Sequence, residues 1–150
     1  MKKIYFAVLL LMAATQGFSQ VKNPVKWEYA SKKINESTYE ISLIATLDPA
    51  WHIYSQTTPE GGPSATVITF TKNPMLQLEG PVKEVGKLEQ KNEPLFGVDV
   101  KQFSNKVSFV QTVKLKAKAK TAITGTIEFM TCNNRECLPP KEEKFSVSLK

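Results

Sequence analysis

Two cysteines, Cys132 and Cys137, are the residues whose type and spacing best fit a chemical role in this sequence. They lie in the stretch Met130-Thr-Cys-Asn-Asn-Arg-Glu-Cys-Leu-Pro-Pro140, which directly follows an alternating apolar run. Four residues separate them, and the turn-prone pair Asn133-Asn134 allows the chain to reverse and bring the sulfurs within bonding distance. A reversible disulfide at this position would exchange electrons when a thiolate attacks one of its sulfurs.

The spacing alone is equally compatible with a purely structural disulfide. In the chain-entropy model a bridge across so short a loop stabilises the fold by about 2 kcal/mol, against almost 5 kcal/mol for a loop of about 100 residues. A short loop also opens and closes without disturbing a core, which suits redox exchange. Short exposed bridges are nevertheless common in secreted domains, so both hypotheses stay open at this point.

The neighbours of the cysteines favour a thiolate only in part. Arg135 lies between them and Lys141 follows, and positive charges stabilise the attacking thiolate. Glu136 adds a negative charge that opposes them, so the charges predict no net direction for a pKa shift of the cysteine thiols. Pro139 and Pro140 stiffen the chain after the second cysteine and remove two backbone donors, which helps to hold its sulfur in place.

Metal and hydrolase chemistry are the competing hypotheses. A structural zinc needs four ligands, whereas the chain offers two cysteines and a single histidine, His52, in the distant stretch Trp51-His-Ile-Tyr54. A Cys–His hydrolase would need an orienting third residue and an oxyanion hole, which the sequence does not indicate. We therefore expect no metal site and no bound cofactor.

The first nineteen residues are typical of a cleavable secretory signal. A basic start at Met1-Lys2-Lys3 precedes an apolar run over Ile4–Ala14, and small residues lead to Ser19. The apolar run is too short for a membrane span, which needs about 20 residues. We expect residues 1–19 to be removed and residues 20–150 to form one periplasmic domain that does not span the membrane, in a compartment where disulfides persist.

The positive charge does not indicate a nucleic-acid partner. The formal net charge is +6, but Arg135 is the only arginine, and nucleic-acid readers rely on arginine forks and basic patches with interleaved aromatics. The densest basic run, Lys114–Lys120, alternates like the solvent face of an edge strand. We expect a solubilising or edge-protecting role for it.

Hydrophobic periodicity of two dominates the chain and predicts strands that bury one face. The predicted strands are centred on 27–29, 39–47, 67–70, 107–115, 123–129 and 145–149. Turn-rich stretches separate them: Asp48-Pro49, Pro59–Pro63, Asn73-Pro74, Gly80-Pro81 and Asn92–Pro94. No window longer than two turns has helical spacing. About eight short strands predict an all-β, immunoglobulin-like antiparallel sandwich, with a closed barrel as the alternative.

Three stretches resemble a known family. The run Thr131–Pro140, with its two cysteines and two prolines, is similar to the N-terminal periplasmic domain of the thiol:disulfide interchange protein DsbD. Trp51–Ser55 is similar to an aromatic segment of that domain, with Gly62-Pro63 fitting the loop that follows, and Asn92–Gly97 is similar to the loop that caps its active site. The resemblance covers about Trp27 to Leu149. It implies an immunoglobulin-like domain with the cysteines on an edge hairpin.

The resemblance also implies roles for individual residues. Cys137 would form mixed disulfides with partners and Cys132 would resolve them. His52 and Tyr54 fall where the family places aromatic residues beside the cysteines, and we include Arg135 and Pro139 in the same surround. The implied cap loop, which shields the reduced pair and swings away on docking, contains Leu95, Phe96 and Gly97.

The implied activity is that of a thiol:disulfide oxidoreductase without a bound cofactor. Its expected partners are thioredoxin-like periplasmic proteins and a separate membrane electron donor, because this sequence shows neither the family's membrane domain nor its thioredoxin-like domain. The chain departs from the best-known members in having one residue fewer between the cysteines and Leu95 in place of an aromatic. The alternative function is a binding or adaptor module with an inert disulfide, which presents Pro59–Pro63 or Asn92–Gly97 to a partner.

Overall fold

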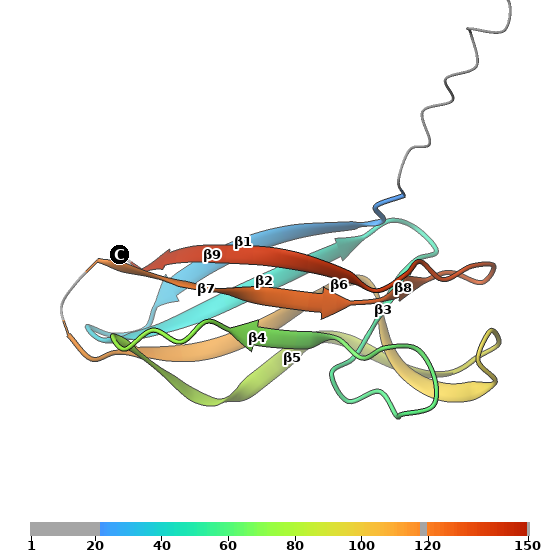
Figure 1. Ribbon diagram of the computed structural model, residues 1–150, viewed down its shortest axis with the longest axis horizontal. Coiled ribbons are helices and arrows are strands. Elements are labelled where there is room, and N and C mark those ends of the chain that lie inside the picture. Colours follow the sequence, from blue (N-terminus) through green and yellow to red (C-terminus); the bar gives the residue numbers. More distant parts are fainter. Residues whose placement is uncertain (1–21, 118–119, 150) are drawn as a thin grey trace, which may run out of the picture.

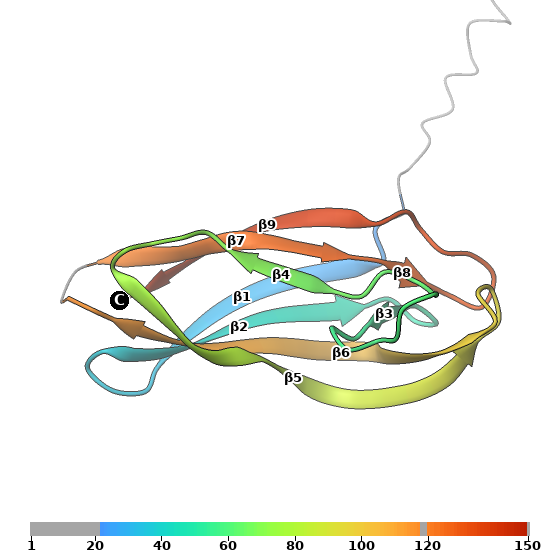
Figure 2. The same cartoon turned by 60° about the horizontal axis from the view of Figure 1, so that its bottom comes forward.

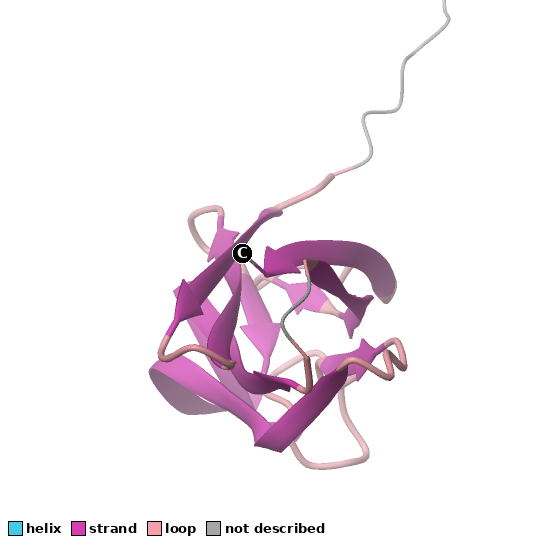
Figure 3. Cartoon of the chain, turned by 90° about the vertical axis from the view of Figure 1, so that its left-hand side faces the viewer, coloured by secondary structure: helices cyan, strands magenta, loops and turns pink. Residues whose placement is uncertain are grey.

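The computed structural model describes residues 22–117 and 120–149, and all its regular elements are β-strands. They are β1 (Val25–Lys33), β2 (Thr38–Leu47), β3 (His52–Tyr54), β4 (Val67–Phe70), β5 (Leu76–Glu93), β6 (Val98–Leu115), β7 (Thr121–Phe129), β8 (Thr131–Cys132) and β9 (Lys141–Leu149). The strands form two antiparallel sheets that pack face to face (Figures 1 and 3). The predicted immunoglobulin-like sandwich is confirmed, and the alternative of one closed barrel is wrong. The predicted signal segment, residues 1–19, lies outside the described residues.

The long strand β6 organises the larger sheet, whose order is β1-β2-β6-β3-β8. One edge of β6 pairs with β5 along nearly its whole length. The other edge is shared, because β2 pairs with 106–114 of β6 and β3 pairs with 102–104. The smaller sheet has the order β4-β7-β9. No helix that could cross a membrane occurs in residues 22–117 and 120–149.

The main core lies between the sheets and follows the predicted alternation. In β2 and β6 the inward positions are fully or almost fully buried, while their sequence neighbours are partly exposed. Trp27 of β1 covers this core, with ring centroids 6.1 Å from Phe109 and 5.3 Å from Phe129. The inward residues of the two strands are Tyr39, Ile41, Leu43, Ala45 and Leu47 from β2, and Val107, Phe109, Gln111 and Val113 from β6.

The prediction of a turn at Gly80-Pro81 is wrong, because these residues lie inside β5. The ladder with β6 shifts register between Glu79 and Lys83, and Gly80 has a left-handed φ of 70°. Proline has no N–H for the ladder, so the chain bulges there without ending the strand. The buried amide of Gln111 donates to the carbonyl oxygens of Glu79 and Gly80 at 3.1 and 3.2 Å, which satisfies two acceptors that the bulge exposes.

The lysine run at 114–120 also differs from its prediction as the face of one strand. β6 ends at Leu115 and β7 begins at Thr121, so most of the run belongs to the connection between the two sheets. Positions 118 and 119 lie outside the described residues. Among the described lysines of the run, the exposed Lys114 keeps the predicted place on a strand.

The chain changes sheets between β7 and β8, and this step positions the cysteines. β7 ends at Phe129 in the smaller sheet, whereas β8 begins at Thr131 in the larger one, so Met130 is the crossing residue. β8 pairs with β3, and Cys132 lies directly opposite His52. The hairpin after β8 and the curled tip of the β5–β6 hairpin lie at the same end of the sandwich (Figures 1 and 2).

Candidate active site

Cys132 and Cys137 form a disulfide across a short hairpin, as the sequence allowed. The two residues face each other in an antiparallel bridge with their Cα atoms 4.0 Å apart. On either side of them the Leu138 N–H donates to the Thr131 carbonyl and the Asn133 N–H donates to the Glu136 carbonyl, both at 2.9 Å. The cysteines therefore occupy a non-hydrogen-bonded pair position, where opposed side chains in an antiparallel ladder come closest.

The turn of this hairpin is held by Asn133. Its side-chain oxygen accepts hydrogen bonds from the backbone N–H groups of Arg135 at 2.8 Å and Glu136 at 3.0 Å, a local pattern for which asparagine is suited. The Glu136 carboxylate pairs with Lys22, which offsets its negative charge beside the cysteines. The hairpin thus has its own backbone and side-chain bonds in addition to the disulfide.

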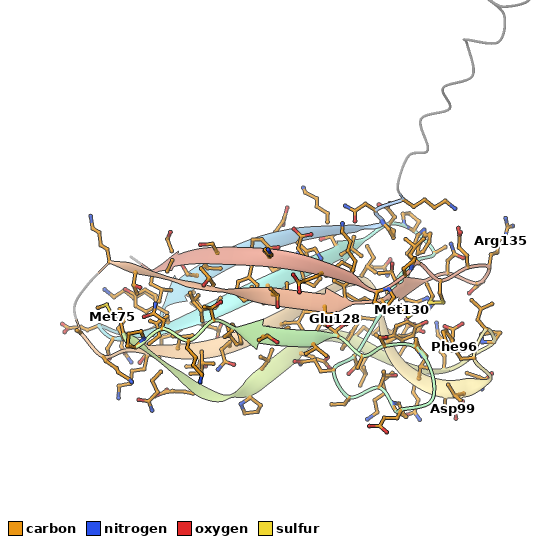
Figure 4. All side chains as sticks on the ribbon, viewed as in Figure 1. Met75, Phe96, Asp99, Glu128, Met130 and Arg135 are labelled. Carbon is orange, nitrogen blue, oxygen red and sulfur yellow. A yellow bond between two sulfur atoms is a disulfide. The ribbon has the colours of Figure 1, made fainter. Side chains whose placement is uncertain are left out.

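The two predicted surround residues of the hairpin lie in solvent. Arg135 is exposed at the turn (Figure 4), and Pro139 is exposed just after Cys137. Neither belongs to the buried cluster around the disulfide. A role of Arg135 or Pro139 in the chemistry stays a prediction.

The two cysteines differ in accessibility. Cys132 is fully buried and packs with Tyr54 and Val100 in a small apolar cluster. Cys137 is only partly buried and lies at the border of this cluster. Cys137 is therefore the more accessible of the two residues, whereas Cys132 is enclosed.

The small cluster lies on the outer face of the larger sheet. Ile53 and Phe103 belong to the main core between the sheets, whereas Tyr54 and Val100 belong to the cluster around Cys132. Successive side chains of a strand point to opposite faces, so β3 separates two apolar clusters and all three of its residues are buried. A strand buried on both faces shows no alternation, which explains why β3 was not predicted.

A loop covers part of this outer face. Residues 55–66 follow β3, and the carboxylate of Glu84 in β5 accepts from the Ser55 hydroxyl and the Gln56 N–H, each at 2.7 Å. Gly62 in this loop lies so close to Val98 that an added Cβ would come within 2.6 Å of its side chain. The sequence needs glycine here because the loop packs directly on the strand that leaves the cap loop.

Three polar side chains are buried together beside the cysteines. The Tyr54 hydroxyl donates to Oε2 of Glu93 at 2.8 Å, and Nε2 of His52 lies 3.0 Å from the same oxygen. Nε2 of His52 is also 3.1 Å from the Tyr54 hydroxyl. Both predicted residues of β3 are thus brought to the site. Sequence reasoning missed Glu93, which is 3% exposed at the end of β5, and its one signal was its place in the stretch 92–97.

Burial decides the protonation of Tyr54 and His52. It raises the pKa of Tyr54, and the hydrogen bond to Glu93 raises it further, so the hydroxyl keeps its proton. Burial also lowers the pKa of His52 below its ordinary value of 6.5, and the bond to Glu93 offsets this only in part. At neutral pH the His52 imidazole is therefore neutral, and the Tyr54 hydroxyl donates to Oε2 of Glu93.

His52 gives a testable pH dependence of stability. Below pH 6.5 His52 takes up a proton in the unfolded chain, whereas in the folded chain it does so only at a lower pH, because its folded-state pKa is lowered. The unfolded state therefore binds more protons in this window, and the free energy of unfolding decreases as the pH falls through it. The limiting slope is about 1.4 kcal/mol per pH unit. Urea unfolding between pH 7.5 and 5.5 measures it. His52→Gln removes the only histidine and is expected to flatten the curve; equal slopes in the two proteins would contradict this assignment.

The predicted cap loop lies at the tip of the β5–β6 hairpin. The N–H groups of Phe96 and Gly97 donate to the Glu93 carbonyl at 3.1 and 2.8 Å, and Gly97 has a left-handed φ of 68°, which glycine adopts without strain. Leu95 and Phe96 are 47% and 38% exposed, and Phe96 lies at the same end as Arg135 (Figure 4). Val98, the first residue of β6 after the cap loop, packs at the border of the cysteine cluster.

Comparisons with known proteins agree with this geometry. A family model for the N-terminal domain of the thiol:disulfide interchange protein DsbD matches residues 21–149. The fold is similar to the N-terminal periplasmic domain of ScsB from Proteus mirabilis, with a TM-score of 0.58 and 19% identity over 89% of this chain and 49% of that one. This chain therefore spans about half the length of that ScsB chain.

A second solved structure, the DsbD N-terminal domain of Neisseria meningitidis in the reduced form, has a TM-score of 0.52 and 13% identity over 83% of this chain and 85% of that one. No curated protein sequence gives a significant match. The family match extends over both sheets, the cysteine hairpin and the hairpin tip described above. The chain belongs to the family of N-terminal domains of the thiol:disulfide interchange protein DsbD.

Proposed function

We propose that this protein is a periplasmic thiol–disulfide exchange protein, which relays electrons between partner proteins through a reversible Cys132–Cys137 disulfide. The observation that carries the proposal is the disulfide on a self-supporting hairpin, with one cysteine enclosed and the other accessible, in a chain of this family. No bound cofactor is required, because the two sulfurs hold and release the electron pair.

The geometry supports a defined order of steps. A thiolate of a reduced partner attacks the Cys137 sulfur, the disulfide breaks, and Cys132 leaves as a thiolate that takes up a proton. The partner's second thiol then loses its proton and attacks the partner's first sulfur, which is bonded to Cys137 in the mixed disulfide. This attack releases Cys137 as a thiolate, which takes up a proton. The partner is then oxidised to a disulfide, and the pair in this protein has gained two electrons and two protons.

The same steps in reverse pass the electrons onward. Cys137 attacks the disulfide of an acceptor, and Cys132 then resolves the mixed disulfide that forms. The enclosed position of Cys132 suits a resolving residue, since it reacts only with the neighbouring sulfur. The accessible position of Cys137 suits the residue that meets partners.

The end of the sandwich that carries Cys137 offers a surface for such partners. The exposed side chain of Phe96 lies there with the exposed Arg135 (Figure 4), and the exposed Leu95 precedes Phe96 in the chain. We infer thioredoxin-like proteins as partners, since these present a reactive cysteine of their own, and a separate membrane protein as electron donor. The relative from Proteus mirabilis is a periplasmic domain, which supports the same compartment for this chain.

The reduction potential of the Cys132–Cys137 pair tests the proposal. Purified protein is equilibrated in graded thiol buffers, and the reduced fraction is measured by thiol alkylation and mass spectrometry. We expect a value between roughly −120 and −270 mV, the range of known exchangers. A value below about −300 mV would identify a structural disulfide and favour a binding module instead.

A further inference from the structure

The tip of the β5–β6 hairpin extends beyond the sheet that supports the rest of it. β3 pairs with β6 only at 102–104, so residues 98–101 of β6 have β5 as their one ladder partner among the described strands. An isolated two-stranded hairpin is marginally stable in water. Residues after β3 also hold the tip, because the Ser55 N–H donates to the Lys101 carbonyl at 2.9 Å and the Lys101 N–H donates to Oγ1 of Thr58 at 3.0 Å. The tip therefore depends on the contacts that it makes with β3, with the loop 55–66 and with the cysteine cluster.

Glu93 provides the polar side-chain contact between the tip and β3. It is the last residue of β5, pairs with Val98 across the tip, and supplies the carbonyl that both cap-loop N–H groups bind. Its carboxylate accepts from Tyr54 at 2.8 Å and lies 3.0 Å from Nε2 of His52, both on β3. Val98, its ladder partner, packs at the border of the Cys132 cluster. One side chain thus connects the base of the cap loop to the strand beside the cysteines.

We propose that Glu93 is a positioning residue that fastens the hairpin tip to β3 and thereby limits access of thiols to the Cys132–Cys137 disulfide. When the bonds of Glu93 to Tyr54 and His52 break, the base of the tip separates from β3. Val98 then leaves the border of the cluster, and the side of the cluster that Val98 covered becomes accessible to thiols. The proposal rests on the proposed function for its biological meaning, but access to the disulfide is measured without any protein partner.

The test is the rate at which dithiothreitol reduces the disulfide in the whole protein and in variants. Dithiothreitol supplies both electrons and both protons and is oxidised to its cyclic disulfide. Glu93→Gln keeps the shape of the side chain but removes its charge, which weakens its bonds to Tyr54 and His52. Because hydrogen bonds to a charged acceptor are stronger than those to a neutral one, we expect the second-order rate constant of reduction to rise about tenfold. Glu93→Ala is expected to exceed Glu93→Gln.

Tyr54→Phe is the partner variant, since it removes only the hydroxyl that donates to Glu93. We expect it to accelerate reduction as well, and we expect the combination with Glu93→Gln to be less than the product of the single effects because both disrupt one bond. Tyr54→Phe also keeps the proposal testable if the Glu93 variants do not fold.

Two controls separate positioning from general destabilisation. Val147→Ala destabilises the smaller sheet, where Val147 is 5% exposed, and Glu79→Gln removes an exposed carboxylate from the same strand as Glu93. We expect both to keep the wild-type rate. An unchanged rate in Glu93→Gln, or an equal rise in Val147→Ala, would overturn the proposal. A failure of partner exchange with an accelerated Glu93→Gln would instead count against the proposed function alone.

Discussion

Replacing Cys137 with Ser is expected to reduce exchange with partner proteins to background, whereas replacing Cys132 with Ala is expected to trap a covalent adduct. Cys137 is the accessible cysteine, so its loss removes the sulfur that forms mixed disulfides. Without Cys132 the mixed disulfide on Cys137 has no neighbouring thiol to resolve it. Periplasmic extract incubated with each variant and separated by non-reducing electrophoresis measures both effects, and mass spectrometry identifies the attached protein.

The matched control is the double variant Cys132→Ala, Cys137→Ser, which keeps the hairpin sequence but lacks both sulfurs. It should give no adduct under the same conditions. Adducts formed through Cys132 in the Cys137→Ser protein would reverse the assigned roles. The adduct forms when the Cys137 thiolate attacks a partner's disulfide and releases one of its sulfurs as a thiolate. Absence of an adduct from Cys132→Ala, with an oxidised partner present, would contradict the exchange mechanism.

Replacing Phe109 with Ala is expected to lower the free energy of unfolding by about 3–5 kcal/mol, as for other buried phenylalanines. Phe109 is fully buried, lies opposite Leu43 in the ladder and contacts the Trp27 ring, so truncation leaves a cavity between the sheets. A typical domain has only about 5–15 kcal/mol in total. Guanidinium unfolding of the oxidised protein, with the slope checked for constancy, measures the loss.

Val85→Ala is the control for this measurement. Val85 lies on β5 next to β6 and also loses methyl groups, but it is 59% exposed, so we expect a change within about 0.5 kcal/mol. If Phe109→Ala lowered the free energy of unfolding no more than Val85→Ala does, the main core would not be centred on β6. The reduction potential should change little in either variant, since neither residue touches the cysteine cluster.

The cysteine hairpin and most strands followed from local features of the sequence. The alternation through Tyr39–Leu47 identified β2, because one face of that strand packs on the core and the other does not. The pair Asn133-Asn134 indicated the turn, and Asn133 indeed holds it. In each case the residues that determine the structure are close in sequence to the feature that they form.

The features that were missed depend on long-range packing. β3 is buried on both faces, and β5 runs through a Gly-Pro pair because Gln111 of the neighbouring strand satisfies the bulged backbone. Glu93 resembles an ordinary surface glutamate in the sequence, and it becomes a buried acceptor only because β3 packs against it, with Tyr54 lying 39 residues and His52 41 residues earlier in the chain. Such sites form where separate elements meet, and the pattern of one segment does not show them.

The bonds that hold the cysteine hairpin have a consequence for the direction of electron flow. The ladder on both sides of the cysteines and the Asn133 turn do not involve the sulfurs, so they persist when the disulfide opens. We therefore expect the oxidised and reduced proteins to present nearly the same surface, so that in the proposed function a partner gains little binding energy by choosing one of them. In the proposed function the direction of electron movement is consequently set by the difference in reduction potential between donor and acceptor, and we expect a single docking surface to serve both.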